Sequence, residues 1–397
     1  MTQISTEILE KYAQVLINFG LNGGKGVSKG EKILVYLPED AKEFLKPLQK
    51  AILEANSHPI IYYLPDNSVL YDSIEKTNKE QREFIPEKTL KGLVDEANHF
   101  VKIKTQSQTP NLEPNIINEL ETSEKKLNKL ISNKESKGKL SRTLATFPTK
   151  YMAQQAGMNF ETYCEEIIRG CYLDYDEPIK EWKKIFSKIE DVKKKLDQMP
   201  IKKLNIKGKN TNLDIGIDEN RKWLGGSGRN IPSYEIFISP HKYKTNGYFY
   251  SNIPAYIRQK LVEGIYVEFS NGKVTKYSAN KGEDALKDLL SQKNMDFIGE
   301  FSLTDKRLSR ITKFMARTLF DENIGGEEGN THIAFGNSYK QSYPNFPIEM
   351  ENKEWDELGF NQADEHLDII STQKRVVTAT LDNNKEIIIY ENGEFKI

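Results

Sequence analysis

The stretch Thr331-His332-Ile333-Ala334-Phe335-Gly336-Asn337-Ser338-Tyr339 and the later segment Glu365-His366-Leu367-Asp368 carry two of the five histidines in this 397-residue chain. Both segments are short and apolar enough to form β-strands. Residues i and i+2 of a strand point to the same face, so His366 and Asp368 present an imidazole and a carboxylate to one point in space. Such donors hold the divalent metals of hydrolytic sites. A lone strand histidine is more often structural, so a metal site is predicted only if further carboxylates join the set.

Length and composition describe a folded chain without a dominant charge. A length of 397 residues exceeds one ordinary core and favours two domains. The 57 basic and 58 acidic residues nearly cancel, which argues against nucleic acid or an anionic membrane as a partner. No apolar run is long enough to span a membrane, and the first residues lack a signal pattern. Because Cys164 and Cys171 are the only cysteines, we expect a soluble cytoplasmic protein.

The first half of the chain has the pattern of an α/β domain. An amphipathic helix is predicted over residues 5–19, then a buried strand at residues 33–37, a helix over residues 41–55 and a strand at residues 59–63. Strand, helix and strand at this spacing form a parallel βαβ unit. Further helices are predicted at about 112–135, 158–171 and 177–197. We therefore expect an α/β domain with a parallel sheet over residues 1–199.

The glycine-rich run Asn22-Gly23-Gly24 raises the alternative of a nucleotide-binding protein. These glycines follow a helix and precede a strand, whereas a phosphate loop follows a strand and opens a helix. Nucleotide binding is therefore a minor alternative that depends on the first half of the chain alone.

The second half changes to short strands separated by glycine and asparagine turns. Gln198-Met199-Pro200 is a plausible boundary, and Asn271-Gly272 between two strand patterns is a strong hairpin turn. Helices are predicted at about 282–291 and around 308–319. We expect an α+β domain with a mixed, largely antiparallel sheet over residues 200–397, and we expect it to carry the metal site.

Two glutamates are candidates for completing that site. Glu235 opens an apolar strand, and Glu300 lies in the middle of another. A carboxylate in such a strand is costly to bury without a partner. Either a metal ion or a salt bridge to a lysine or arginine would offset this cost, and the pattern alone leaves both open.

Short segments along nearly the whole chain match a known pattern. They are Lys11-Tyr12-Ala13, Gly20-Leu21-Asn22, Gly30-Glu31-Lys32, Phe147-Pro148-Thr149, Cys171-Tyr172-Leu173-Asp174, Lys222-Trp223-Leu224-Gly225-Gly226, Asn230-Ile231-Pro232, Pro240-His241-Lys242, Asn271-Gly272-Lys273-Val274, Lys281-Gly282-Glu283 and Leu319-Phe320-Asp321-Glu322-Asn323. In this order they resemble the M29 family of thermophilic metallo-aminopeptidases, the aminopeptidase T and S type.

The resemblance implies a two-metal aminopeptidase that releases N-terminal amino acids from short peptides with a free N-terminus. It implies that two divalent metal ions, zinc, cobalt or manganese, are held by Glu235, Glu300, His332, His366 and Asp368. Glu300 is then the bridging ligand, and a water shared by the two ions is the nucleophile. Tyr339 is similar to the family's active-site tyrosine and would hydrogen-bond the tetrahedral oxyanion. A homodimer whose N-terminal domain encloses the site is also implied.

One position departs from the family pattern. The family commonly has a glutamate just before the first ligand, and here that position is Tyr234. A phenol with an ordinary pKa of about 10 is a poor base near pH 7. Glu322 and His241 are other candidates for the proton transfer.

This departure leaves two alternatives to the aminopeptidase. One is another metal-dependent amidohydrolase or dipeptidase, and the other is a metal- and peptide-binding homologue with impaired catalysis. A second departure is the insertion-like run at residues 324–330. It is either a mobile lip over the site or a longer surface loop.

Overall fold

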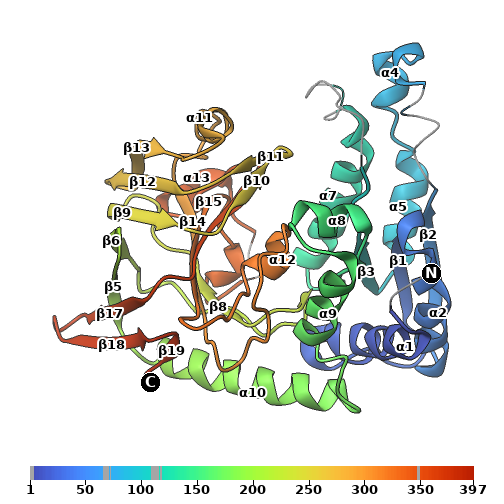
Figure 1. The fold of residues 1–397 in the computed structure, drawn as a ribbon, viewed down its shortest axis with the longest axis horizontal. Coiled ribbons are helices and arrows are strands. Elements are labelled where there is room, and N and C mark those ends of the chain that lie inside the picture. Colours follow the sequence, from blue (N-terminus) through green and yellow to red (C-terminus); the bar gives the residue numbers. More distant parts are fainter. Residues whose placement is uncertain (1–3, 66–70, 72, 109–115, 117–118, 347–348) are drawn as a thin grey trace. The chain divides into compact units, whose positions relative to one another are not determined.

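The computed structural model describes residues 4–65, 71, 73–108, 116, 119–346 and 349–397, which form two compact units (Figure 1). The first unit contains residues 1–182 and 227–231, and the second contains residues 183–226 and 232–397. The boundary expected between residues 199 and 200 stays a prediction about which parts of the chain fold independently.

A five-stranded parallel sheet forms the middle of the first unit, as the βαβ spacing predicted. Its strand order is β2-β1-β3-β4-β7, and every neighbouring pair is parallel. The strands are β1 (Lys32–Pro38), β2 (His58–Leu64), β3 (His99–Lys104), β4 (Ser141–Thr146) and β7 (Asn230–Ile231). β1 and β3 consist largely of buried residues, as central strands covered on both faces do.

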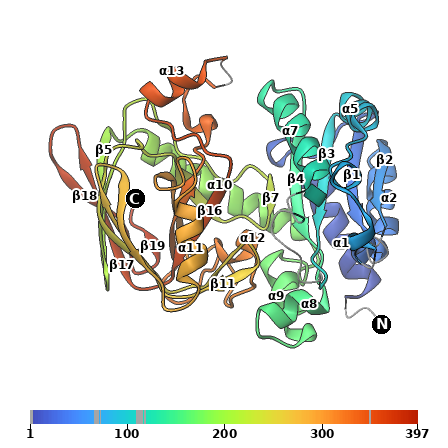
Figure 2. The same ribbon diagram turned by 90° about the horizontal axis from the view of Figure 1, so that it is seen from above.

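Helices cover both faces of this parallel sheet. α5 (Glu87–Glu96) and α7 (Thr122–Ser136) pack on the face that carries Leu34 and Phe100. Figure 2 shows α5 and α7 above the strands and α1 (Thr6–Val15) below them. The Tyr12 hydroxyl of α1 donates to the backbone oxygen of Thr146 on β4 at 3.3 Å, which ties this helix to the sheet.

The other described α- and π-helical segments of the first unit lie partly within the helices predicted over residues 5–19, 41–55, 158–171 and 177–197, and partly where the sequence pattern predicted none. They are the π-helical turn Leu16–Gly20, α2 (Leu45–Glu54), α4 (Lys79–Arg82), α8 (Lys150–Gln155), α9 (Phe160–Gly170) and the beginning of α10 (Pro178–Asp197). The first part of the helix predicted at 112–135 falls on residues outside the described ranges, and the rest of it is α7. Cys164 and Cys171 are both free and buried.

An eight-stranded antiparallel sheet forms one layer of the second unit. Its order is β13-β12-β9-β6-β5-β17-β18-β19. The strands are β5 (Ile201–Gly208), β6 (Thr211–Gly216), β9 (Thr245–Ser251), β12 (Ile265–Ser270), β13 (Lys273–Ser278), β17 (Arg375–Leu381), β18 (Glu386–Glu391) and β19 (Glu394–Phe395). Asn271 and Gly272 join β12 to β13 with left-handed φ angles of 49° and 84°, which confirms the predicted hairpin turn.

A four-stranded antiparallel sheet of order β16-β15-β14-β8 forms the other layer of the second unit. Its strands are β8 (Glu235–Ile238), β14 (Ile298–Thr304), β15 (Asn330–Gly336) and β16 (His366–Ser371). The rings of Phe269 on β12 and Phe335 on β15 lie 6.3 Å apart, so the apolar core lies between the two sheets. Smaller elements are the hairpin β10 (Ala255–Ile257) and β11 (Lys260–Val262), α11 (Glu283–Leu290) and α13 (Asn352–Glu357).

The prediction of a helix around residues 308–319 is wrong. Only α12 (Thr318–Asp321) is helical in this region. Asp321 accepts hydrogen bonds from the backbone N–H groups of Met315 at 2.6 Å and Arg317 at 2.7 Å, and Ala316 between them has a left-handed φ of 54°. These contacts hold the segment as a loop although its apolar spacing is helical.

In the part of the chain that the structure describes, no helix is both long and apolar enough to cross a membrane.

Candidate metal centre

The register of the four-stranded sheet brings most of the predicted ligands onto one face. Glu300 on β14, Ala334 on β15 and Asp368 on β16 stand opposite one another, so their side chains share a face. His332 lies two residues before Ala334, and His366 lies two residues before Asp368. Because residues i and i+2 share a face, both imidazoles point to the same side as the two carboxylates.

Glu235 joins this face from the edge strand β8. It stands opposite Thr304, which lies four residues after Glu300 on β14. The alternate residues of these strands are apolar and buried, among them Ile236, Phe301, Ile333 and Ile369. The sheet therefore has one apolar face in the core and one face that carries buried polar groups.

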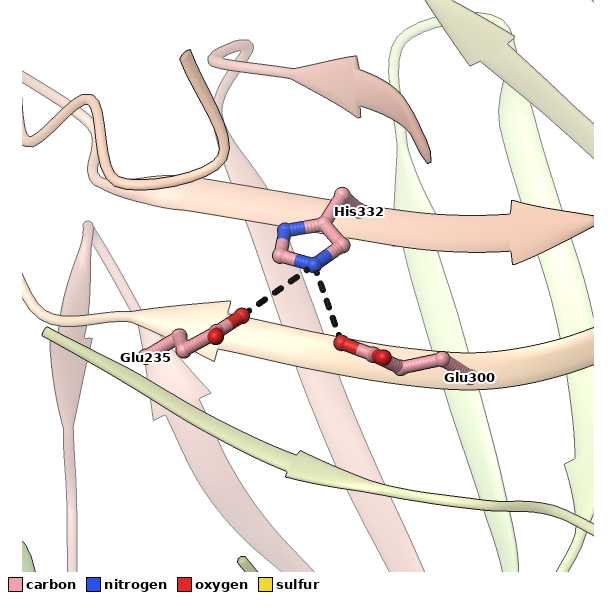
Figure 3. A group of neighbouring side chains, drawn as sticks. All are labelled: Glu235, Glu300 and His332. Atoms are coloured by element: carbon pink, nitrogen blue, oxygen red, sulfur yellow. Dashed lines mark hydrogen bonds and ion pairs between the residues drawn. The ribbon is translucent and has the colours of Figure 1, made fainter. Parts of the chain in front are cut away.

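His332 lies at the centre of the polar group. Its Nε2 atom is 3.2 Å from Glu300 Oε1 and 3.4 Å from Glu235 Oε2, as Figure 3 shows. Asp368 Oδ1 is 3.8 Å from the same nitrogen. The side chain of His332 is 0% exposed, so this nitrogen faces three carboxylates without competition from solvent.

His366 contacts the same carboxylates from the next strand. Its Nε2 atom is 3.4 Å from Glu300 Oε2 and 3.4 Å from Asp368 Oδ1. The other ring nitrogen, Nδ1, is 2.9 Å from the backbone oxygen of Asn337. With Nδ1 donating to this carbonyl, Nε2 is the nitrogen left for a metal ion. Glu300 therefore turns one oxygen to each histidine.

The pKa shifts of these groups show a site that favours positive charge. Burial raises the pKa of Glu235, and the charges of Glu300 and Asp368 raise it further against the hydrogen bond with His332. Burial lowers the pKa of His332, but its hydrogen bonds with Glu235 and Glu300 outweigh burial and hold that pKa well above the usual range. Both shifts have one cause, which is several carboxylates enclosed together.

The donors present fit a divalent cation. In the described residues, Glu235, Glu300 and Asp368 form ion pairs only with histidines. Buried carboxylates without a lysine or arginine partner are costly unless another cation neutralises them. The ligand atoms of Glu235, Glu300 and His332 all lie within 4.8 Å of one another. Imidazole nitrogen with carboxylate oxygen is a donor set that zinc, cobalt and manganese accept.

Tyr339 lies beside this cluster, as its predicted role requires. Its ring packs edge-on against the imidazole of His366, with the centroids 5.2 Å apart. On another side it contacts the ring of Phe237, at 5.1 Å. The backbone N–H of Tyr339 donates to Ser239 Oγ at 2.8 Å, which fixes the start of the loop after β15.

Glu322 is a further carboxylate of this site, which the sequence placed only among the candidates for proton transfer. Burial raises the pKa of Glu322 well above its usual range, and the charges of Glu235 and Asp368 raise it further. The Thr304 hydroxyl of β14 donates to the backbone oxygen of Glu322 at 3.3 Å. The sequence signal for this residue was its place in Leu319-Phe320-Asp321-Glu322-Asn323, one of the segments that resemble the family.

Two other polar contacts at the centre were not predicted from the sequence. The Ser302 hydroxyl donates to Glu235 Oε2 at 3.2 Å. Asn323 accepts from the backbone N–H of Tyr234 at 2.6 Å, and its amide donates to Glu322 Oε1 at 3.3 Å. Asn323 therefore fixes Glu322 relative to the start of β8.

The second candidate for proton transfer, His241, is placed differently. Its Nε2 atom lies 3.6 Å from Asp218 Oδ2, and burial lowers the pKa of this imidazole. Its ion-pair partner among the described residues is therefore outside the metal centre.

The run at residues 324–330 is held against neighbouring segments of its own unit. The Gly325 N–H donates to the Ile311 oxygen at 2.9 Å, and Lys306 Nζ donates to the Glu327 backbone oxygen at 3.1 Å. A side chain at Gly329 would overlap the Tyr390 hydroxyl, so the end of the run packs tightly. These contacts favour an anchored loop over a mobile lip.

A comparison with sequence families agrees with the pattern of motifs. Residues 5–395 match the family Peptidase_M29, described as thermophilic metalloprotease (M29). Aminopeptidase T of Thermus aquaticus is 22% identical over 416 residues, which cover 99% of this chain and 99% of that protein. Aminopeptidase AmpS of Bacillus subtilis (strain 168) is 25% identical over 425 residues, which cover 98% of each.

A comparison of structures agrees with the fold. Wild-type AmpT from Thermus thermophilus superposes with a TM-score of 0.85 at 20% sequence identity, covering 98% of this chain and 99% of that chain. This structural similarity confirms the expected fold, which combines a domain with a parallel sheet and a domain with antiparallel sheets.

Proposed function

This chain belongs to the M29 family of thermophilic metalloproteases and is a metal-dependent aminopeptidase, and we propose that it uses two metal ions to release N-terminal residues from short peptides. The observation that carries this proposal is Glu300, whose two oxygens lie 3.2 Å and 3.4 Å from the histidines His332 and His366. A carboxylate with one oxygen beside each of two imidazoles could help to hold two cations.

We assign the donors to two neighbouring cation sites. Glu235 and His332 would hold one cation and His366 the other. Glu300 and Asp368, which contact both histidines, would contribute to both. Glu322 is added as a further carboxylate because its charge interacts with those of Glu235 and Asp368. When bound, the ions supply a water of lowered pKa and a positive charge beside the peptide carbonyl.

The protein's own residues orient these donors and the substrate. The Asn337 carbonyl fixes the tautomer of His366, and the Ser302 hydroxyl fixes one oxygen of Glu235. The Tyr339 hydroxyl is proposed to donate to the oxyanion of the tetrahedral intermediate, since its ring lies against His366. Phe237 packs on Tyr339 and limits the movement of that ring.

One observation favours a second candidate. Tyr234 is completely buried and occupies the position where a carboxylate base was expected. A phenol is a poor base near neutral pH, so Tyr234 is also compatible with two other functions. One is a metal-dependent dipeptidase or amidohydrolase, and the other is a homologue that binds metal and peptide without turnover.

A metal-reconstitution experiment separates these candidates. Metal-stripped protein receives Zn²⁺, Co²⁺ or Mn²⁺, and hydrolysis of aminoacyl p-nitroanilides is compared with that of their N-acetylated forms. The aminopeptidase requires metal-restored cleavage of the free forms only, lost in His366→Ala and retained in the exposed control His58→Ala. Equal cleavage of acetylated substrates contradicts the proposal, and two bound ions without turnover favour the binding protein.

The expected homodimer and the cytoplasmic location are part of the same proposal. The mass of the protein in solution, measured by light scattering at several concentrations, tests the first of these expectations.

A further inference from the structure

A second cluster of reactive side chains lies in the first unit, at the amino ends of three parallel strands. His99 opens β3 and Ser141 opens β4, and these two residues stand opposite each other in the sheet. Glu31 immediately precedes β1, which pairs with β3 on its other side. Adjacent strands therefore bring together a hydroxyl, an imidazole and a carboxylate that lie far apart in the sequence.

The contacts among these three groups follow one chain of hydrogen bonds. His99 Nδ1 is 2.7 Å from Ser141 Oγ, and His99 Nε2 is 2.8 Å from Glu31 Oε2. With the ring proton on Nε2, the imidazole donates to Glu31, and Nδ1 accepts from the Ser141 hydroxyl. A hydroxyl, a base and an acid that orients the base, each within hydrogen-bond reach, define an activated nucleophile.

Burial holds the histidine of this chain in place, and the serine is less deeply buried. The His99 side chain is 5% exposed, so its ring is fixed between the neighbouring strands. Burial raises the pKa of Glu31, but hydrogen bonds from the Ser28 N–H and from His99 outweigh burial and lower that pKa. Glu31 is therefore ionised at neutral pH, as the orienting acid must be. Ser141 is half-buried.

The glycine-rich turn that the metal centre does not use lies next to the same hydroxyl. The backbone N–H of Asn22 donates to Ser141 Oγ at 3.0 Å. Asn22, Gly23 and Gly24 all have left-handed φ angles, of 54°, 64° and 89°. A side chain added at Gly23 would meet nothing within 4 Å, so the space beside this turn is open. Backbone N–H groups in such turns make concave sites for anions, including the oxyanion of an acyl-transfer reaction.

We propose that Ser141, His99 and Glu31 form a second, metal-independent acyl-transfer site that hydrolyses small carboxylic esters. Ser141 Oγ forms a bond to the ester carbonyl carbon while its proton passes to His99 Nδ1. The bond from that carbon to the alcohol oxygen then breaks, and the proton on His99 passes to the departing alkoxide. A water molecule attacks the resulting serine ester in the same way, which releases the carboxylic acid and restores the Ser141 hydroxyl.

The test is covalent labelling of protein treated with EDTA, which removes any contribution of the metal centre. A fluorophosphonate probe is added, and the labelled residue is located by mass spectrometry. We expect the label on Ser141, and we expect hydrolysis of p-nitrophenyl acetate to fall by about 10²- to 10⁴-fold in Ser141→Ala and His99→Gln. Ser136→Ala is the matched control, because Ser136 donates to the Asn133 backbone oxygen and pairs with no histidine among the residues that the structure describes.

Folding of each variant is checked by thermal denaturation, and Glu31→Gln is a further variant that keeps the shape of its side chain. A folded wild-type protein without label on Ser141 overturns the proposal. Equal labelling of the wild type and a folded His99→Gln variant overturns it too, because the hydroxyl is then not activated by the histidine. EDTA is expected to remove peptide hydrolysis and to leave ester hydrolysis, so failure of this site and failure of the proposed aminopeptidase are distinguishable.

Discussion

Glu300 shows how one side chain could serve both cations of the proposed two-metal site. The carboxylate group is planar and has two equivalent oxygens. In Glu300 one oxygen faces the imidazole of His332 and the other faces that of His366. No other side chain type offers two equivalent anionic donors so close together. The charge of Glu300 also raises the pKa of Glu235, so these carboxylates accumulate negative charge that a metal would neutralise.

The first prediction concerns this residue. Glu300→Gln keeps the shape of the side chain but removes the charge between the histidines, so we expect lower metal content and a loss of activity. The loss should exceed about 10- to 100-fold, the usual cost of changing a residue that only supports a ligand. Mass spectrometry measures the metal content, and a peptide-hydrolysis assay measures the activity. Glu268→Gln on β12, where Glu268 pairs with exposed Lys276, should change neither.

A second prediction concerns the pH dependence of stability at Glu31. The pKa of Glu31 is lowered in the folded chain, so its ionised form stabilises the fold above the unfolded pKa, and this contribution is lost as the pH falls through the folded pKa. Glu31→Gln should therefore destabilise the protein by at most about 1 kcal/mol at pH 7, because partial exposure to solvent weakens the interactions of Glu31. Urea unfolding at pH 7 and below pH 4 measures the difference between variant and wild type. A difference that does not shrink at the lower pH contradicts the assignment.

At the scale of elements, a β-bulge in β14 decides which face Glu300 occupies. Ile298 stands opposite Phe335, and Glu300 stands opposite Ala334, so Gly299 between them is an extra residue. In a regular strand, residues two positions apart point to the same face. The bulge makes Ile298 and Glu300 point to opposite faces. Ile298 therefore turns to the apolar side with Phe335, and Glu300 turns to the polar side.

A third prediction tests this bulge. A Cβ at Gly299 would lie 2.4 Å from the Gly336 oxygen and 2.5 Å from the Asn337 oxygen. Since these are backbone atoms, Gly299→Ala must displace β14 from β15 and should cost about 1–3 kcal/mol of stability together with metal affinity. The control is Gly92→Ala in α5, where nothing lies within 4 Å and alanine should stabilise the helix by about 0.5–1 kcal/mol. Denaturant unfolding and metal titration of both variants check this difference.

At the scale of the whole molecule, the two proposed sites lie in different units. All the proposed metal ligands come from the four-stranded sheet and the α12 region of the second unit, whereas Glu31, His99 and Ser141 belong to the first. A ligand stabilises only the structure that binds it. Metal binding should therefore act on the unfolding of the second unit.

The fourth prediction follows from this separation. Removal of metal with EDTA should lower the midpoint of thermal unfolding, and Zn²⁺, Co²⁺ or Mn²⁺ at about 100 times its Kd should restore about 2.7 kcal/mol. Differential scanning calorimetry measures the shift. His332→Ala should show no response to metal, because its nitrogen faces three carboxylates of the centre. A full response in this variant would place the stabilising ion elsewhere.

The sequence alone predicted the two classes of sheet and most of the residues of the candidate metal centre. Strand and helix spacing is a local property, and the parallel sheet of the first unit and the antiparallel sheets of the second follow from it. His366 and Asp368 share a face because they are two residues apart, a relation that needs no tertiary structure. Glu235, Glu300 and His332 were candidates from their places in apolar strand patterns, and the family resemblance joined them to the same set. The structure brings all five side chains together.

Only the tertiary structure decided how distant strands align. The bulge at Gly299, the place of Glu322 beside the carboxylates, and the meeting of Glu31 with His99 and Ser141 all depend on strand pairing between segments far apart in the chain. The helix expected around residues 308–319 failed for the same reason, since the Asp321 carboxylate captures backbone N–H groups that a helix would have used. Local spacing fixes which way a side chain points along its own strand, but register and long-range hydrogen bonds fix which side chains it meets.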